Sequence, residues 1–160
     1  MRSLGILLIL SASLFVSRVY RRHVVREARA LYELKELFVM IDCALSVNPV
    51  SITEIISGTQ LPRLEELGFI GGVKGGATPA VVYRRVHKSM GLGSEIDAAV
   101  LSFFEHGCRG EYSRAVNSAR EVKNRLQCEW CAKEKESSAR IKTFTVVSLA
   151  LALGVAIMVI

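Results

Sequence analysis

The sequence predicts an all-α protein: an antiparallel helical bundle with an N-terminal and a C-terminal transmembrane helix. Apolar residues make up 51% of the 160 residues, and they concentrate in uncharged segments at the two ends. Between these segments, apolar residues recur at spacings of three and four, as they do on one face of a helix. No stretch alternates between polar and apolar residues as a half-buried strand would. We therefore expect an anchor at 1–20, a cytoplasmic bundle at 21–142 and a second membrane helix at 143–160.

The first anchor rests on an uncharged segment at 3–17 that is short for a membrane span. A secretory signal peptide would have a similar apolar stretch. Five arginines follow it closely, and such a block opposes translocation of the chain behind it. They are Arg18, Arg21, Arg22, Arg26 and Arg29. We therefore favour a retained anchor, with the signal peptide as the alternative.

The second anchor is the stronger prediction. Residues 143–160 carry no charge, and 18 residues of helix cover about 27 Å, close to the thickness of the hydrocarbon layer. Lys133, Lys135, Arg140 and Lys142 precede it, so both basic flanks border the central region. The positive-inside rule then places that region in the cytoplasm and both chain ends across the membrane.

The net charge of +6 fits contact with membrane lipid and needs no nucleic acid partner. The four cysteines (Cys43, Cys108, Cys128 and Cys131) would lie in a reducing compartment, so we do not interpret them as a disulfide framework.

The first body helix is expected at 22–47 and ends at Asn48-Pro49. It can continue from the first anchor, because no Gly or Pro occurs between Gly5 and Asn48. Its inward face is expected to carry Leu31, Leu34, Leu37, Phe38, Ile41 and Leu45.

Shorter helices are expected next. Ser51 and Glu54 have the spacing of a capping box, Gly58 is a stop, and Pro62 opens the following helix. Residues 71–76 are predicted to form a loop. A helix at 79–90 would bury Val81, Val82, Val86 and Met90. A helix capped by Ser94 would bury Ile96, Ala99, Val100, Phe103 and Phe104.

A long final helix is expected to begin at Glu111 and to continue into the second anchor. Its apolar positions follow helical spacing: Tyr112, Ala115, Val116, Ala119, Val122, Leu126 and Trp130.

Two motifs suggest chemistry but lack its requirements. The segment 71–78 resembles a phosphate-binding loop, yet Ala77 stands where that motif needs Lys, and no strand precedes it. Cys128 and Cys131 form a CxxC pair that suggests redox or metal chemistry, with His106 and Cys108 as further ligands, but it falls inside a predicted helix. We find no catalytic constellation, and we expect no enzyme activity, no cofactor and no small-molecule substrate.

Basic residues on two predicted helices are candidates for docking an acidic partner, with a solvated helix face as the alternative. They are Arg84, Arg85, Lys88, Arg114, Arg120 and Lys123.

The layout resembles the stage III sporulation protein AB family, which is similar to the cytoplasmic domain of type II secretion F-type platform proteins. The resemblance rests on the anchor that leads into an Arg-rich helix and on the stretch 31–37. It also rests on the fragment 82–86 and on Asp97, Leu101, Phe104, Gly107 and Gly110. The sequence departs from the family pattern between Met90 and Ser94 and at Cys128 and Cys131.

This resemblance implies a non-enzymatic membrane platform on the mother-cell side of the outer forespore membrane. Its implied partners are a cytoplasmic secretion-type ATPase and other membrane proteins of the sporulation channel, with self-association into a homo-oligomer also open. Two alternatives are a platform protein of another secretion or pilus system and a membrane-tethered thiol or metal-binding protein.

Overall fold

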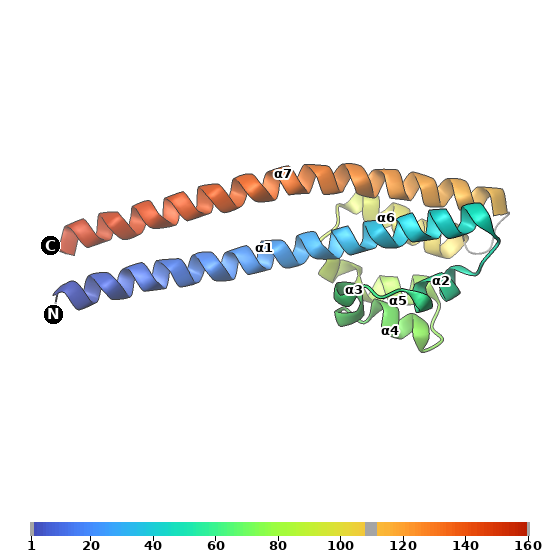
Figure 1. Cartoon of the computed structure of the whole chain (residues 1–160), viewed down its shortest axis with the longest axis horizontal. Helices are drawn as coiled ribbons and strands as arrows, with labels where there is room; N and C mark the ends of the chain where they lie inside the picture. Colours follow the sequence, from blue (N-terminus) through green and yellow to red (C-terminus); the bar gives the residue numbers. More distant parts are fainter. Residues whose placement is uncertain (1, 108–111, 160) are drawn as a thin grey trace. The chain divides into compact units, whose positions relative to one another are not determined.

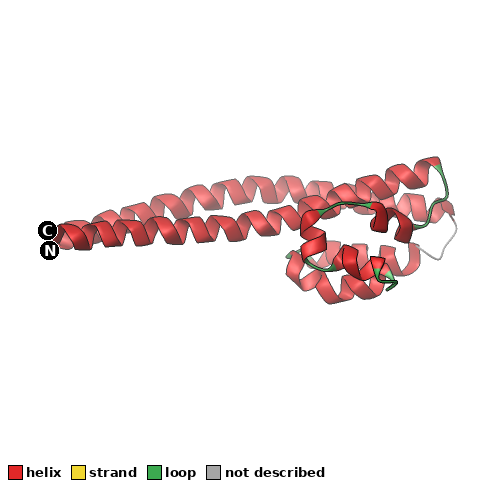
Figure 2. Ribbon diagram, turned by 60° about the horizontal axis from the view of Figure 1, so that its bottom comes forward, coloured by secondary structure: helices red, strands yellow, loops and turns green. Residues whose placement is uncertain are grey.

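A computed structural model describes residues 2–107 and 112–159 of the chain, and this part consists of helices and their connections, with no strand (Figures 1 and 2). The helices are α1 (Arg2–Val47), α2 (Ile52–Gly58), α3 (Pro62–Glu66), α4 (Phe69–Lys74), α5 (Pro79–Val86), the 3-10 helix η1 (His87–Met90), α6 (Ser94–Ser102), the π-helix η2 (Phe103–Gly107) and α7 (Tyr112–Val159). The all-α prediction is confirmed.

The chain forms two compact units. One, called the arm unit below, comprises Met1–Arg26 and Ala132–Ile160. The other, called the body, comprises Glu27–Cys131. The helices α1 and α7 each contribute one end to the arm unit and the other end to the body.

The body has one apolar core. All six residues predicted for the inward face of α1 are at most 3% exposed. Five aromatic rings meet in the centre of the core, with neighbouring ring centroids 5.0 to 6.3 Å apart: Phe38, Phe69, Tyr83, Phe103 and Phe104. The helix α7 covers the core with Ala115, Ala119, Val122 and Leu126, as predicted. Tyr112 is instead exposed, while Val116 and Trp130 are only partly buried.

Three of the predicted local features are wrong: a loop, a buried position of α5 and the N-cap of α6. The segment 71–76 is not a loop, because residues 69–74 form α4. In α5, Val81 is 50% exposed and Tyr83 takes the inward position in its place. Two predicted helix starts are confirmed: Ser51 is the N-cap of α2, although its side chain makes no capping hydrogen bond, and Pro62 opens α3. Gly93, not Ser94, caps α6.

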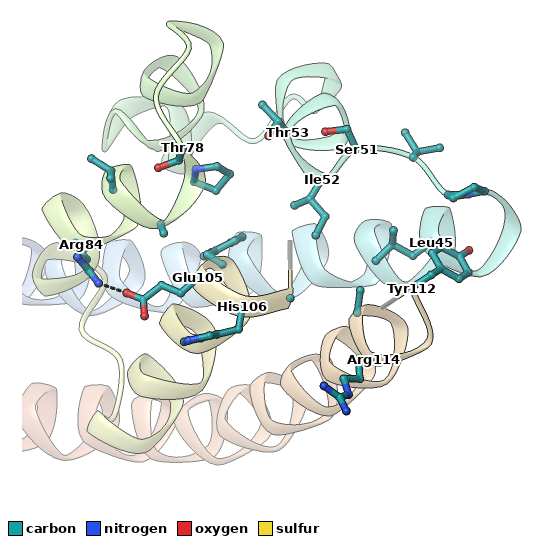
Figure 3. Close-up of a pocket in the computed structure, with 18 residues that line it drawn as sticks. Leu45, Ser51, Ile52, Thr53, Thr78, Arg84, Glu105, His106, Tyr112 and Arg114 are labelled. Carbon is teal, nitrogen blue, oxygen red and sulfur yellow. Dashed lines mark hydrogen bonds and ion pairs between the residues drawn. The ribbon is translucent and has the colours of Figure 1, made fainter. Parts of the chain in front are cut away.

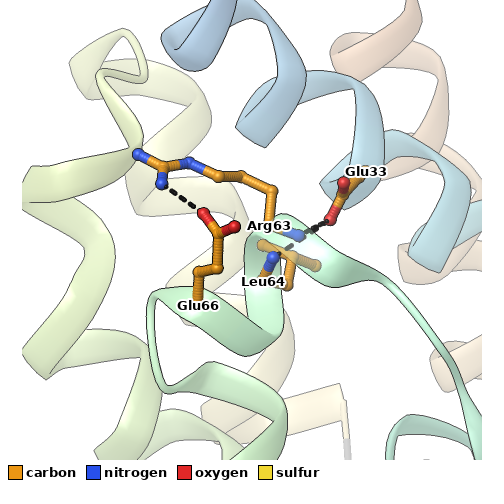
Figure 4. Close-up of polar contacts among 4 residues, drawn as sticks. All are labelled: Glu33, Arg63, Leu64 and Glu66. Carbon is orange, nitrogen blue, oxygen red and sulfur yellow. Dashed lines mark hydrogen bonds and ion pairs between the residues drawn. The ribbon is translucent and has the colours of Figure 1, made fainter.

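The start of α3 is capped from another helix (Figure 4). The Glu33 carboxylate on α1 accepts hydrogen bonds from the backbone N–H groups of Arg63 (2.7 Å) and Leu64 (3.0 Å). The N-cap residue Leu61 has no side-chain oxygen for this purpose, so Glu33 supplies the acceptor that a local Ser or Asp would provide.

In the arm unit, the ends of α1 and α7 run antiparallel to each other (Figure 1). Tyr20 and Phe144 stack across the pair, with ring centroids 4.3 Å apart and an angle of 19° between the rings. Both predicted terminal segments are helical, but within the described residues no helix is both long enough and apolar enough to cross a membrane. The side chains at 1–10, 13, 14, 17, 149, 152, 153 and 155–160, which belong to the predicted spans, lie outside the described part.

Candidate functional site

The body contains a large open groove of about 1100 Å³ (Figure 3). Its walls come from the end of α1, from α2 and the segment before it, from the start of α5, from η2 and from the start of α7. The polar side chains on these walls belong to Ser51, Thr53, Thr78, Arg84, Glu105, His106, Tyr112 and Arg114. Leu45, Ile52 and Phe104 supply apolar surface.

Arg84, Glu105 and His106 in the groove already have partners within the protein, whereas Arg114 has no ion-pair partner among the described residues. The Arg84 guanidinium donates to the Glu105 carboxylate. His106 Nδ1 lies 3.3 Å from the carbonyl oxygen of Ser102, so this ring nitrogen contacts the backbone of η2's neighbouring helix α6. Most of the polar side chains in the groove are exposed, so they can still offer hydrogen bonds and charge to a ligand.

Three of the six predicted docking cations are engaged within the body. Arg84 pairs with Glu105, and two cations of α7 converge on Asp42 of α1. Lys123 Nζ lies 2.5 Å from Asp42 Oδ2, and Arg120 Nε lies 3.7 Å from Asp42 Oδ1. Asp42 is buried, so this cluster ties α1 to α7. These three cations already have a structural role.

The other three cations are exposed. Arg85, Lys88 and Arg114 have no ion-pair partner among the described residues. Arg114 lines the groove. Exposed cations without a partner are available to an acidic surface at little desolvation cost.

Two acidic residues with structural contacts were not predicted as site residues: Asp42 was not singled out, and Asp97 entered only through the family resemblance. Tyr83 donates a hydrogen bond of 2.7 Å to Asp97 Oδ1, and His87 Nε2 lies 3.9 Å from Asp97 Oδ2. Burial, then this hydrogen bond and the charge of Asp97, raise the pKa of Tyr83 well above its ordinary range. In the sequence, Asp42 and Asp97 are carboxylates within apolar helix patterns. That pattern does not identify the residues that they contact.

The segment that resembles a phosphate-binding loop uses its backbone elsewhere. The N–H groups of Gly72, Gly75, Gly76 and Ala77 donate to the carbonyl oxygens of Gly68, Gly71, Val73 and Gly72. These bonds belong to α4 and to the turn that ends it, so these four donors are not directed at a phosphate.

The cysteines do not form a metal cluster in the described part of the chain, where no group of three His, Cys, Asp or Glu side chains is placed to hold an ion. Cys128 and Cys131 are free and exposed on α7, and Cys43 is free and exposed on α1. Cys108, which the sequence suggested as a ligand together with His106, lies outside the described residues.

Comparison with known proteins identifies no relative: no family model matches the chain, and no curated protein and no solved structure is significantly similar to it.

Proposed function

We propose that this protein is a non-enzymatic membrane platform, anchored at both ends of the chain, whose body docks a cytoplasmic partner. The proposal rests first on the two uncharged terminal segments and their basic flanks. It rests equally on the arm unit, where the helices that carry these segments pair antiparallel.

The stack of Tyr20 on Phe144 is the observation that carries the membrane part of the proposal. Tyr20 follows the first uncharged segment by three residues, and Phe144 is the second residue of the last one. Their ring centroids are 4.3 Å apart, so the C-terminal end of the first uncharged segment lies beside the N-terminal end of the last one. Tyrosine is enriched at the membrane–water boundary, which is where a two-anchor protein would place Tyr20.

The docking surface in this proposal consists of Arg85, Lys88 and Arg114. They are exposed and have no ion-pair partner among the described residues. An acidic partner would gain association rate and specificity from them. Arg84, Arg120 and Lys123 belong to the structural ion pairs instead.

The partner we propose is a secretion-type ATPase, in a channel like that of the stage III sporulation protein AB family. The protein would then lie on the mother-cell side of the outer forespore membrane. Support for this step is the resemblance of layout and local fragments in the sequence. A gene for such an ATPase directly upstream, with several genes for small membrane proteins downstream, would support the sporulation channel. A pilus or secretion operon around the gene would favour the more general platform.

Cysteine accessibility in intact cells tests the topology. One cysteine replaces Lys74, which is exposed at the end of α4, and another is added after Ile160, in a chain whose four native cysteines are serine. We expect a membrane-impermeant maleimide to label the C-terminal cysteine and to leave position 74 unlabelled until the cells are lysed. Labelling of position 74 in intact cells would overturn the proposal.

Matched charge variants test the docking surface. Arg85→Gln, Lys88→Gln and Arg114→Gln are combined in one chain, and Arg26→Gln, Arg125→Gln and Lys135→Gln in a control with the same net charge. We expect the first chain to lose co-purification with the ATPase and the control to retain it. Equal retention by both chains would reject this surface.

A second candidate function uses the exposed thiols of Cys128 and Cys131 on α7. Metal analysis of the purified protein separates it from the platform. Stoichiometric zinc that is lost in Cys128→Ser would favour a membrane-tethered metal protein. Metal-free protein with unchanged stability in that variant would reject it.

A further inference from the structure

We infer that the arm unit binds the headgroup of an anionic phospholipid in a groove beside the Tyr20–Phe144 stack; this site rests on the membrane anchoring proposed above. The groove is shallow and open, with a volume of about 520 Å³. Its lining consists of Tyr20 on α1 and Glu136, Ala139, Arg140, Thr143, Phe144 and Val147 on α7.

The two ends of this lining differ in chemistry along α7. The lining residues of α7 that come first in the sequence include the charged Glu136 and Arg140, and those that come last are the apolar Phe144 and Val147. The apolar surface continues beyond the groove, because Val146 and Leu151 are 67% and 66% exposed. A phospholipid has the same order of parts, with a charged headgroup followed by acyl chains. A free phosphate would use only the polar end.

The charge around the groove favours an anionic headgroup. Arg140 donates to Glu136 at 2.6 Å, one turn earlier on α7, and its side chain is 64% exposed. Lys142 on α7 and Arg18 and Arg22 on α1 do not line the groove, but they are exposed and close to its residues in sequence, and no acidic residue occurs on α1 before Glu27. Basic grooves between membrane helices on the cytoplasmic side bind anionic headgroups by this chemistry.

The donors on the groove wall suit a phosphodiester. Arg140 has a planar guanidinium that can bind two phosphate oxygens at once, and its present partner is a solvent-exposed carboxylate. Tyr20 on α1 and Thr143 on α7 also line the groove, and each carries a hydroxyl that can donate a hydrogen bond. The exposed Arg140–Glu136 pair stabilises the helix only slightly, so loss of this pair costs little, and the released Glu136 carboxylate is exposed enough to turn into solvent, away from the phosphate.

Lipid retention by the full chain tests the site. The protein is purified in a neutral detergent and mixed with phosphatidylglycerol or phosphatidylcholine, and the bound lipids are counted by native mass spectrometry. We expect phosphatidylglycerol to be retained in preference. We expect Arg140→Gln to reduce its apparent affinity about fivefold, as for loss of one cation near an anionic lipid surface.

Arg125→Gln is the matched control. Arg125 is also exposed on α7 and pairs with a glutamate one turn earlier, Glu121 at 2.7 Å, but it belongs to the body. Its removal should leave lipid retention unchanged. Circular dichroism of both variants establishes that each is as helical as the wild type.

Three results would overturn the inference: equal retention of the two lipids, equal loss in Arg140→Gln and Arg125→Gln, or displacement of the lipid by millimolar inorganic phosphate, which would indicate a free-anion site. Alkaline carbonate extraction of membranes tests the membrane anchoring independently of the lipid site. A chain that stays in the membrane but shows no lipid preference lacks the site and keeps its anchors. A chain released by carbonate contradicts the membrane platform itself.

Discussion

Glu33 accepts a hydrogen bond from the backbone N–H of Leu64, 31 residues later in the chain, and thereby caps a helix to which it does not belong. The same carboxylate oxygen accepts from Arg63. Glu33 is only 6% exposed, so water cannot replace these bonds if the carboxylate is removed.

The first prediction concerns this cap. Glu33→Ala should lower the free energy of unfolding by about 1 to 3 kcal/mol, because two backbone donors at the start of α3 lose their acceptor. Urea denaturation of the full chain in detergent, followed by circular dichroism, measures the change. Glu66→Ala is the control, because Glu66 makes an exposed ion pair with Arg63 (Figure 4), and it should cost less than about 1 kcal/mol. Equal effects would mean that the cap does not stabilise the body.

The second prediction separates structural cations from docking cations. Lys123→Ala should destabilise the body by about 2 to 4 kcal/mol, because it leaves the buried Asp42 carboxylate with only the more distant Arg120. Lys88→Ala should change stability by less than about 0.5 kcal/mol, since Lys88 is exposed. A stable Lys123→Ala chain that fails to bind its partner would return Lys123 to the docking surface.

The third prediction concerns alkaline pH. The pKa of Tyr83 is raised in the folded body, so the folded state keeps the phenol proton where the unfolded chain releases it. The contribution of Tyr83 to stability is therefore complete below its unfolded pKa of about 10 and is lost as the pH rises above that value.

Tyr83→Phe measures this contribution. Below pH 9 the variant should be less stable by about 1.5 to 3 kcal/mol, the worth of a hydrogen bond to a charged group such as Asp97. The difference between wild type and variant should shrink as the pH rises above about 10. A constant difference across that range would contradict the assignment.

The fourth prediction concerns two adjacent glycines of α4. A Cβ atom at Gly72 would lie 2.8 Å from Val82 Cγ1, whereas a Cβ at Gly71 would meet nothing within 4 Å. Gly72→Ala should therefore cost about 1 to 3 kcal/mol by overpacking. Gly71→Ala should be neutral or stabilise by up to about 1 kcal/mol through its helix propensity. Thermal unfolding measures both changes in stability. In a background that carries Val82→Ala, the cost of Gly72→Ala should be smaller, whereas the effect of Gly71→Ala should be unchanged.

The long helices were predictable because their apolar residues repeat over many turns. The six inward residues of α1 are an example, and all six are buried. The helix α4 was missed because Gly71 and Gly72 are poor helix formers, and the reason for Gly72, close packing against Val82, depends on a segment ten residues away.

The polar contacts were not predictable for a related reason. A carboxylate at position 33 or 42 fits the solvated face of a helix as well as it fits a buried cap or ion pair. Its partners, Leu64 and Lys123, are brought close only by the tertiary fold. The same holds for the cations: the basic spacing indicated a charged surface, but only the structure separates Lys123, bound to Asp42, from the exposed Lys88.

The ion pair between Asp42 and Lys123 spans 81 residues of sequence, and this fixes an order of events during synthesis. A ribosome that adds 5 to 20 residues per second needs about 4 to 16 seconds to make the intervening chain. Throughout that interval the nascent α1 presents a carboxylate and an apolar stripe whose covering helix does not yet exist. The body can therefore close only after α7 has emerged, and a chain cut short before Lys123 would display an open core to the quality-control machinery of the cell.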